Sequence, residues 1–128
     1  MKKFILGLIA AGAFASAAQA QDVRAVRTLD DYVCMNLNLP DARMRDPAAP
    51  RVPIRVAPRA DAAVGTLATP IVITKTPEHV VDGYAEVLQL TGKPGWIEAN
   101  MIVPYRSASN PYARCTPSLL SNGRIGTG

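Results

Sequence analysis

The hydrophobic pattern of the chain begins with an uncharged, mostly apolar run, Phe4–Ala18. Two lysines precede this run, and it ends in Ala18-Gln19-Ala20, a small-x-small sequence of the kind that signal peptidase recognises. The run is short for a membrane anchor, the alternative interpretation, because a spanning helix needs ~20 apolar residues. We therefore predict a signal peptide over residues 1–20 and a bacterial periplasmic or secreted chain that starts at Gln21 and has no membrane span.

Residues 21–53 form an N-terminal flank with two different patterns. Four apolar residues have a spacing that fits one face of a helix: Leu29, Tyr32, Val33 and Leu37. An extended arm held by Cys34 is the alternative for this first part. Pro40–Pro53 contains four prolines, which exclude a long helix or a central strand, so we expect a linker or a long surface loop.

From Ile54 onward, short runs of alternating or β-branched residues are separated by turn signals such as Asp82-Gly83. The runs predicted as strands are Ile54–Val56, Val64–Leu67, Ile71–Thr74, Tyr84–Leu90, Trp96–Ala99 and Ile102–Val103. Several short strands with few helical stretches are typical of a small all-β barrel or sandwich. We place this domain at residues 54–105 and expect a flank at residues 106–128 whose last residues fray.

Alternation within these strands also predicts the core. The candidate core residues are Val56, Leu67, Val72, Val87, Ile97 and Ile102. Glycine is expected where a strand bends sharply or approaches another strand closely. Gly65 and Gly95 are two such positions, and we expect valine to be tolerated poorly at both.

The order of short motifs between residues 54 and 103 is distinctive. Its first half contains Ile54-Arg55-Val56, Val64-Gly65-Thr66-Leu67 and Ile71-Val72-Ile73, and its second half contains Gly83-Tyr84-Ala85-Glu86-Val87, Gly95-Trp96-Ile97 and Met101-Ile102. This order resembles the bacterial SH3-like domain, in which Gly-Trp-x-x-Val and Gly-Trp-Val/Ile are recurrent and Tyr84 replaces the first tryptophan. The resemblance implies a small SH3-like barrel of about five strands, with a recognition role.

Charge and cysteine content narrow the class of function. Without the two signal lysines, the formal charge falls from +4 to +2 and is scattered, which argues against a nucleic-acid partner. Cys34 and Cys115 lie near the two ends of an exported domain and predict a structural disulfide that joins the flanks; two free thiols are the alternative. A metal site would need more ligands, because His79 is the only histidine.

Motifs for catalysis are missing from the sequence. It contains no Gly-rich phosphate loop, zinc-ligand spacing or nucleophile elbow. Asp30 and Asp31 are adjacent and so point apart, which does not suit an acid/base pair around one bond. His79 lies in a polar segment and is interpreted as a loop residue. We predict that the protein is not an enzyme and has no cofactor.

Aromatic and cationic residues remain as candidates for recognition. Arg59 lies in Ala57–Ala63, where SH3-like domains have a long loop beside their binding face, and a guanidinium pairs well with a carboxylate. Tyr84, Trp96 and Tyr105 are the other candidate binding residues. For Trp96, the alternative role is packing at the edge of the core. We predict a monomeric binding module for cell-wall peptide; the alternative is a periplasmic accessory or inhibitor protein that binds another exported protein.

Overall fold

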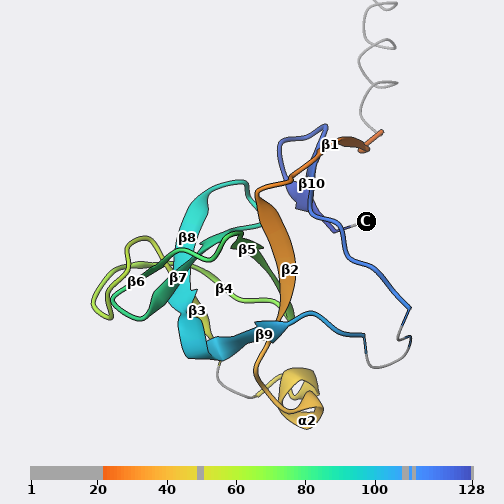
Figure 1. Ribbon diagram of the computed structural model, residues 1–128. Coiled ribbons are helices and arrows are strands. Elements are labelled where there is room, and N and C mark those ends of the chain that lie inside the picture. Colours follow the sequence, from red (N-terminus) through yellow and green to blue (C-terminus); the bar gives the residue numbers. More distant parts are fainter. Residues whose placement is uncertain (1–21, 49–50, 108–109, 111, 128) are drawn as a thin grey trace, which may run out of the picture.

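The computed structural model describes residues 22–48, 51–107, 110 and 112–127, so the predicted signal peptide lies outside the described residues. The strands of the larger sheet are β2 (Tyr32–Leu37), β3 (Pro53–Arg55), β4 (Val64–Leu67), β5 (Ile71–Lys75), β6 (Val80–Val81), β7 (Tyr84–Leu88), β8 (Pro94–Glu98) and β9 (Ile102–Pro104). Their order is β4-β3-β8-β7-β5-β2-β9, with β6 on β7, and all described pairs are antiparallel. The all-β prediction is confirmed (Figure 1).

Smaller elements complete the described chain. A three-stranded sheet contains β1 (Ala25–Thr28), β10 (Ser118–Leu120) and β11 (Ile125–Gly126), and therefore brings the two flanks together. Among its described residues, the proline-rich segment contains one short helix, α2 (Asp41–Arg45), and a 3₁₀ turn, η1 (Ala99–Met101), precedes β9. Because β10 and β11 belong to the three-stranded sheet, the C-terminal flank is paired as far as Gly126. The sequence had predicted frayed residues at this end.

β2 determines how the larger sheet is arranged. For the first part of the N-terminal flank, the sequence left a helix or an extended arm as alternatives, and the structure shows the extended form. β2 pairs with β5 from Tyr32↔Lys75 to Asn36↔Ile71, and with β9 on its other side. Successive side chains of a strand point to opposite faces, so Cys34 and Leu37, three residues apart, contribute to different hydrophobic clusters.

The larger sheet does not close into the five-stranded barrel that the resemblance implied, and it has more strands. β4 and β5 are consecutive in the chain, but among the described strands β4 pairs with β3 alone. A strand has two hydrogen-bonding edges. Because β2 occupies one edge of β5 and β7 part of the other, β4 does not pair with β5, and β4 and β9 remain as the two edges of an open sheet.

Two hydrophobic clusters lie on opposite faces of β5. Buried members of the inner cluster are Leu37, Ile54, Ala68, Val72, Ala85, Val87, Ile97 and Ile102. The outer cluster consists of buried Leu29, Cys34, Ile73 and Ile125, against which Tyr32, Ile71, Leu88, Leu90, Tyr105, Cys115 and Leu119 pack. The inner cluster is thus formed mainly by the segment that resembles SH3-like domains, and the outer cluster combines this segment with the flanks.

The predicted core is correct at four positions and wrong at two. Val72, Val87, Ile97 and Ile102 are buried, whereas Val56 is 56% exposed and Leu67 is 53% exposed. β3 ends at Arg55, so Val56 lies in the bend after the strand and outside its alternation, and Ile54 is the buried residue of β3. Leu67 is exposed because it lies on the edge strand β4, which has a neighbour on one side only.

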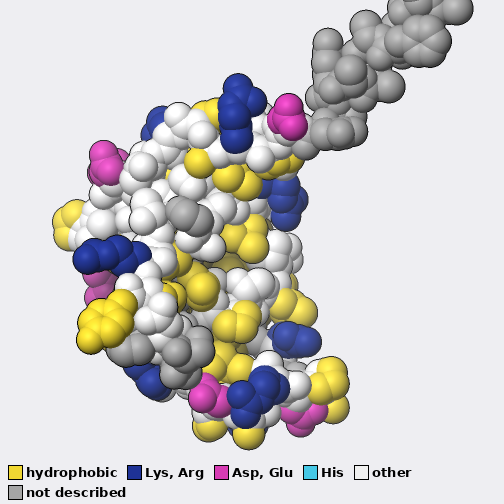
Figure 2. Space-filling view, turned by 90° about the vertical axis from the view of Figure 1, so that its right-hand side faces the viewer, with side chains coloured by type: hydrophobic (Ala, Val, Ile, Leu, Met, Phe, Trp, Pro, Cys, Tyr) yellow, Lys and Arg dark blue, Asp and Glu magenta, His cyan; other side chains and the backbone are white. Residues whose placement is uncertain are grey.

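The predicted disulfide is confirmed. Cys34 and Cys115 are bonded with an S–S distance of 2.03 Å and are separated by 81 residues. Two backbone hydrogen bonds hold the flanks nearby: Leu29 N donates to Pro117 O, and Ile125 N donates to Leu90 O. The flanks still leave a hollow in which hydrophobic side chains gather, between the small sheet above and α2 below (Figure 2).

Candidate functional site

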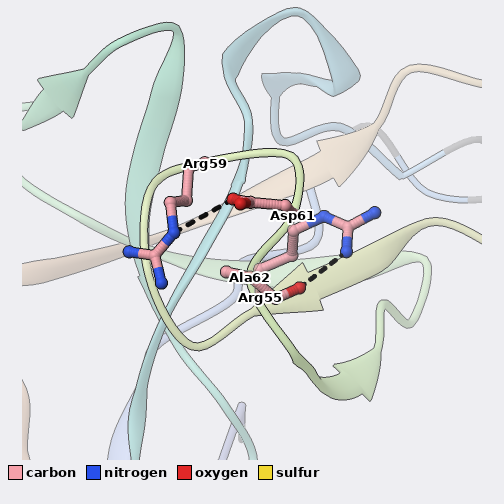
Figure 3. Close-up of polar contacts among 4 residues, drawn as sticks. All are labelled: Arg55, Arg59, Asp61 and Ala62. Atoms are coloured by element: carbon pink, nitrogen blue, oxygen red, sulfur yellow. Dashed lines mark hydrogen bonds and ion pairs between the residues drawn. The ribbon is translucent and has the colours of Figure 1, made fainter.

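Arg59 lies in the loop between β3 and β4, where its guanidinium is exposed but already paired. Arg59 Nε lies 3.0 Å from Asp61 Oδ1 in the same loop (Figure 3). Arg55 Nη1 donates to the backbone oxygen of Ala62 at 2.9 Å and so ties the loop to β3. A ligand carboxylate at Arg59 would therefore have to compete with Asp61.

Trp96 is half-buried on β8 and is surrounded by polar residues. In register it lies opposite Arg55 of β3 on one side and Glu86 of β7 on the other. The His79 ring meets the Trp96 ring edge to face, with centroids 5.4 Å apart, and His79 Nδ1 lies 2.8 Å from Glu86 Oε1. We call Arg55, His79, Glu86 and Trp96, together with the adjoining β3–β4 loop that carries Arg59, the Trp96 face.

The other two predicted binding residues do not extend this face. Tyr84 is only 9% exposed and is paired with Glu98, so its ring is not an open platform. Tyr105 packs against the outer cluster, as Cys115 also does. The structure thus links the Arg59 loop to Trp96 through Arg55, buries Tyr84 in the sheet, and places Tyr105 among the residues of the disulfide-linked flanks.

A second candidate site, the apolar groove, is at the gap between β4 and β5. It consists of two adjoining cavities of about 180 Å³ and 350 Å³, which share Thr69, Ile71 and Leu90. Aliphatic side chains form much of its wall: Leu67, Ile71, Leu88, Leu90 and Ile125. Threonines and Gln89 also line it, and Arg124 is the one charged side chain among the described lining residues.

Gln89 contributes a buried polar side chain to the groove. The residue is 5% exposed, and its Nε2 donates to the backbone oxygen of Pro94 at 3.0 Å. This bond identifies Oε1 as the remaining acceptor, and no described residue donates a hydrogen bond to it. A Cβ built on Gly65 would lie 2.8 Å from Oε1, so the amide reaches the backbone of β4.

Sequence reasoning missed the apolar groove. Its walls come from β4, β5, the β7–β8 turn and β11, segments that are far apart along the chain. The individual residues are ordinary aliphatics and threonines, and only their juxtaposition is unusual. The one available indication was that Leu90, the last residue of the predicted strand Tyr84–Leu90, and Ile125 of the polar C-terminal flank are apolar residues beside turn sequences.

In comparisons with known proteins, no family model, curated protein or solved structure matches the chain. Within the described ranges, no helix is long and apolar enough to cross a membrane. No group of three or more histidine, cysteine, aspartate or glutamate side chains in the same part of the chain could hold a metal ion.

Proposed function

We propose that this protein is a non-catalytic, exported binding module that holds an extended segment of a partner polypeptide in the apolar groove. The observation that carries the proposal is the composition of the groove: aliphatic walls with a single cation, Arg124. Such walls bind apolar side chains because both surfaces leave water, at about 25 cal/mol per Å² of buried apolar area. This chemistry favours the accessory or inhibitor function over recognition of a polar wall fragment.

A binding role also suits the polar groups around the groove. Nucleophilic or acid/base catalysis needs a nucleophile or base within hydrogen-bond reach of the reacting atoms. The described lining residues offer threonine, glutamine and arginine, with no histidine, cysteine or carboxylate beside them. These groups can orient a ligand, and we assign them that role.

Export and family membership are part of the same proposal. Export is supported by the signal-like sequence at residues 1–20 and by the disulfide, since disulfides persist in oxidising compartments. Kinship with bacterial SH3-like domains is supported by the order of motifs, which fall on β3, β4, β5, β7 and β8. An open variant of that fold, with β2 added to the sheet, is the form we propose.

Recognition of cell-wall peptide is the second candidate function, and the Trp96 face favours it. This face has an exposed guanidinium at Arg59 and a half-buried indole, which together suit a peptide carboxylate and its backbone. The pairing of Arg59 with Asp61 weakens this candidate, because the ligand would displace an existing ion pair.

A selection from a phage-displayed library of random peptides separates the two functions, with sedimentation of purified peptidoglycan as the second assay. Thr69→Trp fills the groove from an exposed position, and Thr116→Trp is the matched control outside it. We expect peptides with alternating apolar residues, and at least about tenfold weaker binding by Thr69→Trp, from the loss of one buried apolar side chain. The control variant should bind as the wild type does.

Two results would contradict the groove proposal. One is a selection that enriches no peptide on the oxidised wild-type protein. The other is peptidoglycan binding that Arg59→Ala weakens and Thr69→Trp leaves unchanged, which would move the function to the Trp96 face.

A further inference from the structure

β4 is an unusually open edge of the larger sheet. Its four residues, Val64–Leu67, include neither a charge nor a proline, and Leu67 is more than half exposed. Natural proteins commonly protect an edge strand with charges, prolines or a covering segment, because a bare edge pairs with other chains. The opposite edge strand, β9, ends in Pro104, so the two edges differ.

The register shows which backbone groups β4 offers at this edge. Ala68 N donates to Val52 O at 2.7 Å, and Leu67 and Thr66 pair with Pro53 and Ile54 in the same register. In an antiparallel pair, the residues whose N–H and C=O face the partner alternate with residues whose groups face away. Thr66 therefore directs its backbone groups to β3, and Leu67 directs its N–H and C=O to the free edge.

This free edge adjoins the apolar groove. Thr66 and Leu67 line the cavity of about 180 Å³. The pairing of β7 with β5 includes Ile73 and Thr74 but not Ile71, so the start of β5 borders the same gap. A strand added ~4.8 Å from β4 would lie over this cavity and direct alternate side chains into it.

Charge complementarity indicates what the added strand carries. Arg124 lies at the cavity that borders β4, and no acidic side chain among the described residues is within ion-pair distance of it. The buried amide of Gln89, with Oε1 beside β4, can accept a hydrogen bond from a nearby N–H. An extended segment with apolar side chains and one carboxylate therefore matches the edge, the walls and the cation together.

We propose that β4 is a strand-addition site: an extended segment of a partner polypeptide pairs with the Leu67 edge, buries apolar side chains in the groove and places a carboxylate at Arg124. This inference rests on the proposed function and specifies its binding mode. Main-chain hydrogen bonds at the edge supply affinity, and the groove selects the side chains.

The first test measures backbone pairing. The probe is a synthetic, fluorescein-labelled peptide that alternates valine and threonine and carries one glutamate, titrated by fluorescence anisotropy against the oxidised mature protein. N-methylation of alternate peptide nitrogens removes the edge donors, and we expect about tenfold weaker binding in one of the two methylation registers. Hydrogen exchange of the Leu67 amide should slow when the unmodified peptide is added.

The second test measures the charge. Arg124→Gln should weaken binding of the glutamate peptide about fivefold and leave binding of the corresponding glutamine peptide unchanged. Arg45→Gln on α2, outside the groove, is the matched control and should bind both peptides as the wild type does.

The outcomes distinguish this inference from the proposed function. If Thr69→Trp abolishes binding, but neither methylation register nor Arg124→Gln changes it, the groove binds peptide without strand addition and the inference is wrong. If the library yields binders and the alternating peptide does not bind, the inference is again wrong and the groove function stands. If the library yields no binder and the alternating peptide does not bind, both proposals are wrong.

Discussion

The inner and outer clusters are shielded from solvent by different parts of the chain. Strands that follow one another closely along the chain form most of the inner cluster, and its central residues Val87 and Ile97 are completely buried. The outer cluster depends on flanks from both ends of the described chain, held by the Cys34–Cys115 disulfide, and Ile71 and Leu90 remain only half-buried there. Distant flanks thus cover their face incompletely, and the apolar groove is what they leave open.

The largest effect is expected in the inner cluster. Ile97→Ala removes part of a side chain with no exposed surface and leaves a cavity among close neighbours, which should cost about 4 kcal/mol of unfolding free energy. Urea unfolding followed by far-ultraviolet circular dichroism measures it. A cost below about 1 kcal/mol would show that the inner cluster is loosely packed and would remove the contrast between the clusters.

Removal of the disulfide should affect the outer cluster selectively. The double variant Cys34→Ala, Cys115→Ala should lose about 3 kcal/mol, because the cross-link closes a long loop in the unfolded chain. Native-state hydrogen exchange should show a larger loss of protection at Ile125, whose N–H bonds to Leu90 O, than at Ile97. Equal loss at both positions would mean that the clusters unfold as one unit.

Valine substitutions at two glycines compare a rigid contact with a flexible one. A Cβ on Gly95 would lie 2.5 Å from Ile54 Cγ2 in the inner cluster, so Gly95→Val should cost about 3 kcal/mol. A Cβ on Gly65 would meet the side-chain amide of Gln89 at the groove, which can move, so Gly65→Val should cost about 1 kcal/mol. Thermal unfolding of both variants measures the difference, and the reverse order would contradict this account.

The smallest effect is expected on the Trp96 face. Arg59→Ala removes an ion pair whose two side chains are largely exposed, so the change in unfolding free energy should be at most about 0.5 kcal/mol. Chemical denaturation at low and high salt checks this value. A large, salt-dependent loss would indicate that the loop between β3 and β4 stabilises the sheet more than its exposure suggests.

The positions of most strands were predictable from the sequence because they follow local rules. β4 coincides with the predicted Val64–Leu67, and the ends of β5 and β9 differ from the predictions by one residue. Alternation, β-branched residues and turn chemistry act over a few residues, so they can be read without the fold. The cysteine count predicted the disulfide for a similarly simple reason, since it left one possible pair.

Only the tertiary structure decided how the strands associate. Periodicity could not show that β2 lies between β5 and β9, because edge-to-edge pairing joins segments far apart in sequence. That insertion occupies an edge of β5, leaves β4 unpaired on one side and keeps the sheet open. The chain by itself therefore determined six of the described strands, its cross-link and half of the buried residues of the inner cluster, whereas the open edge and the groove beside it exist only through long-range packing.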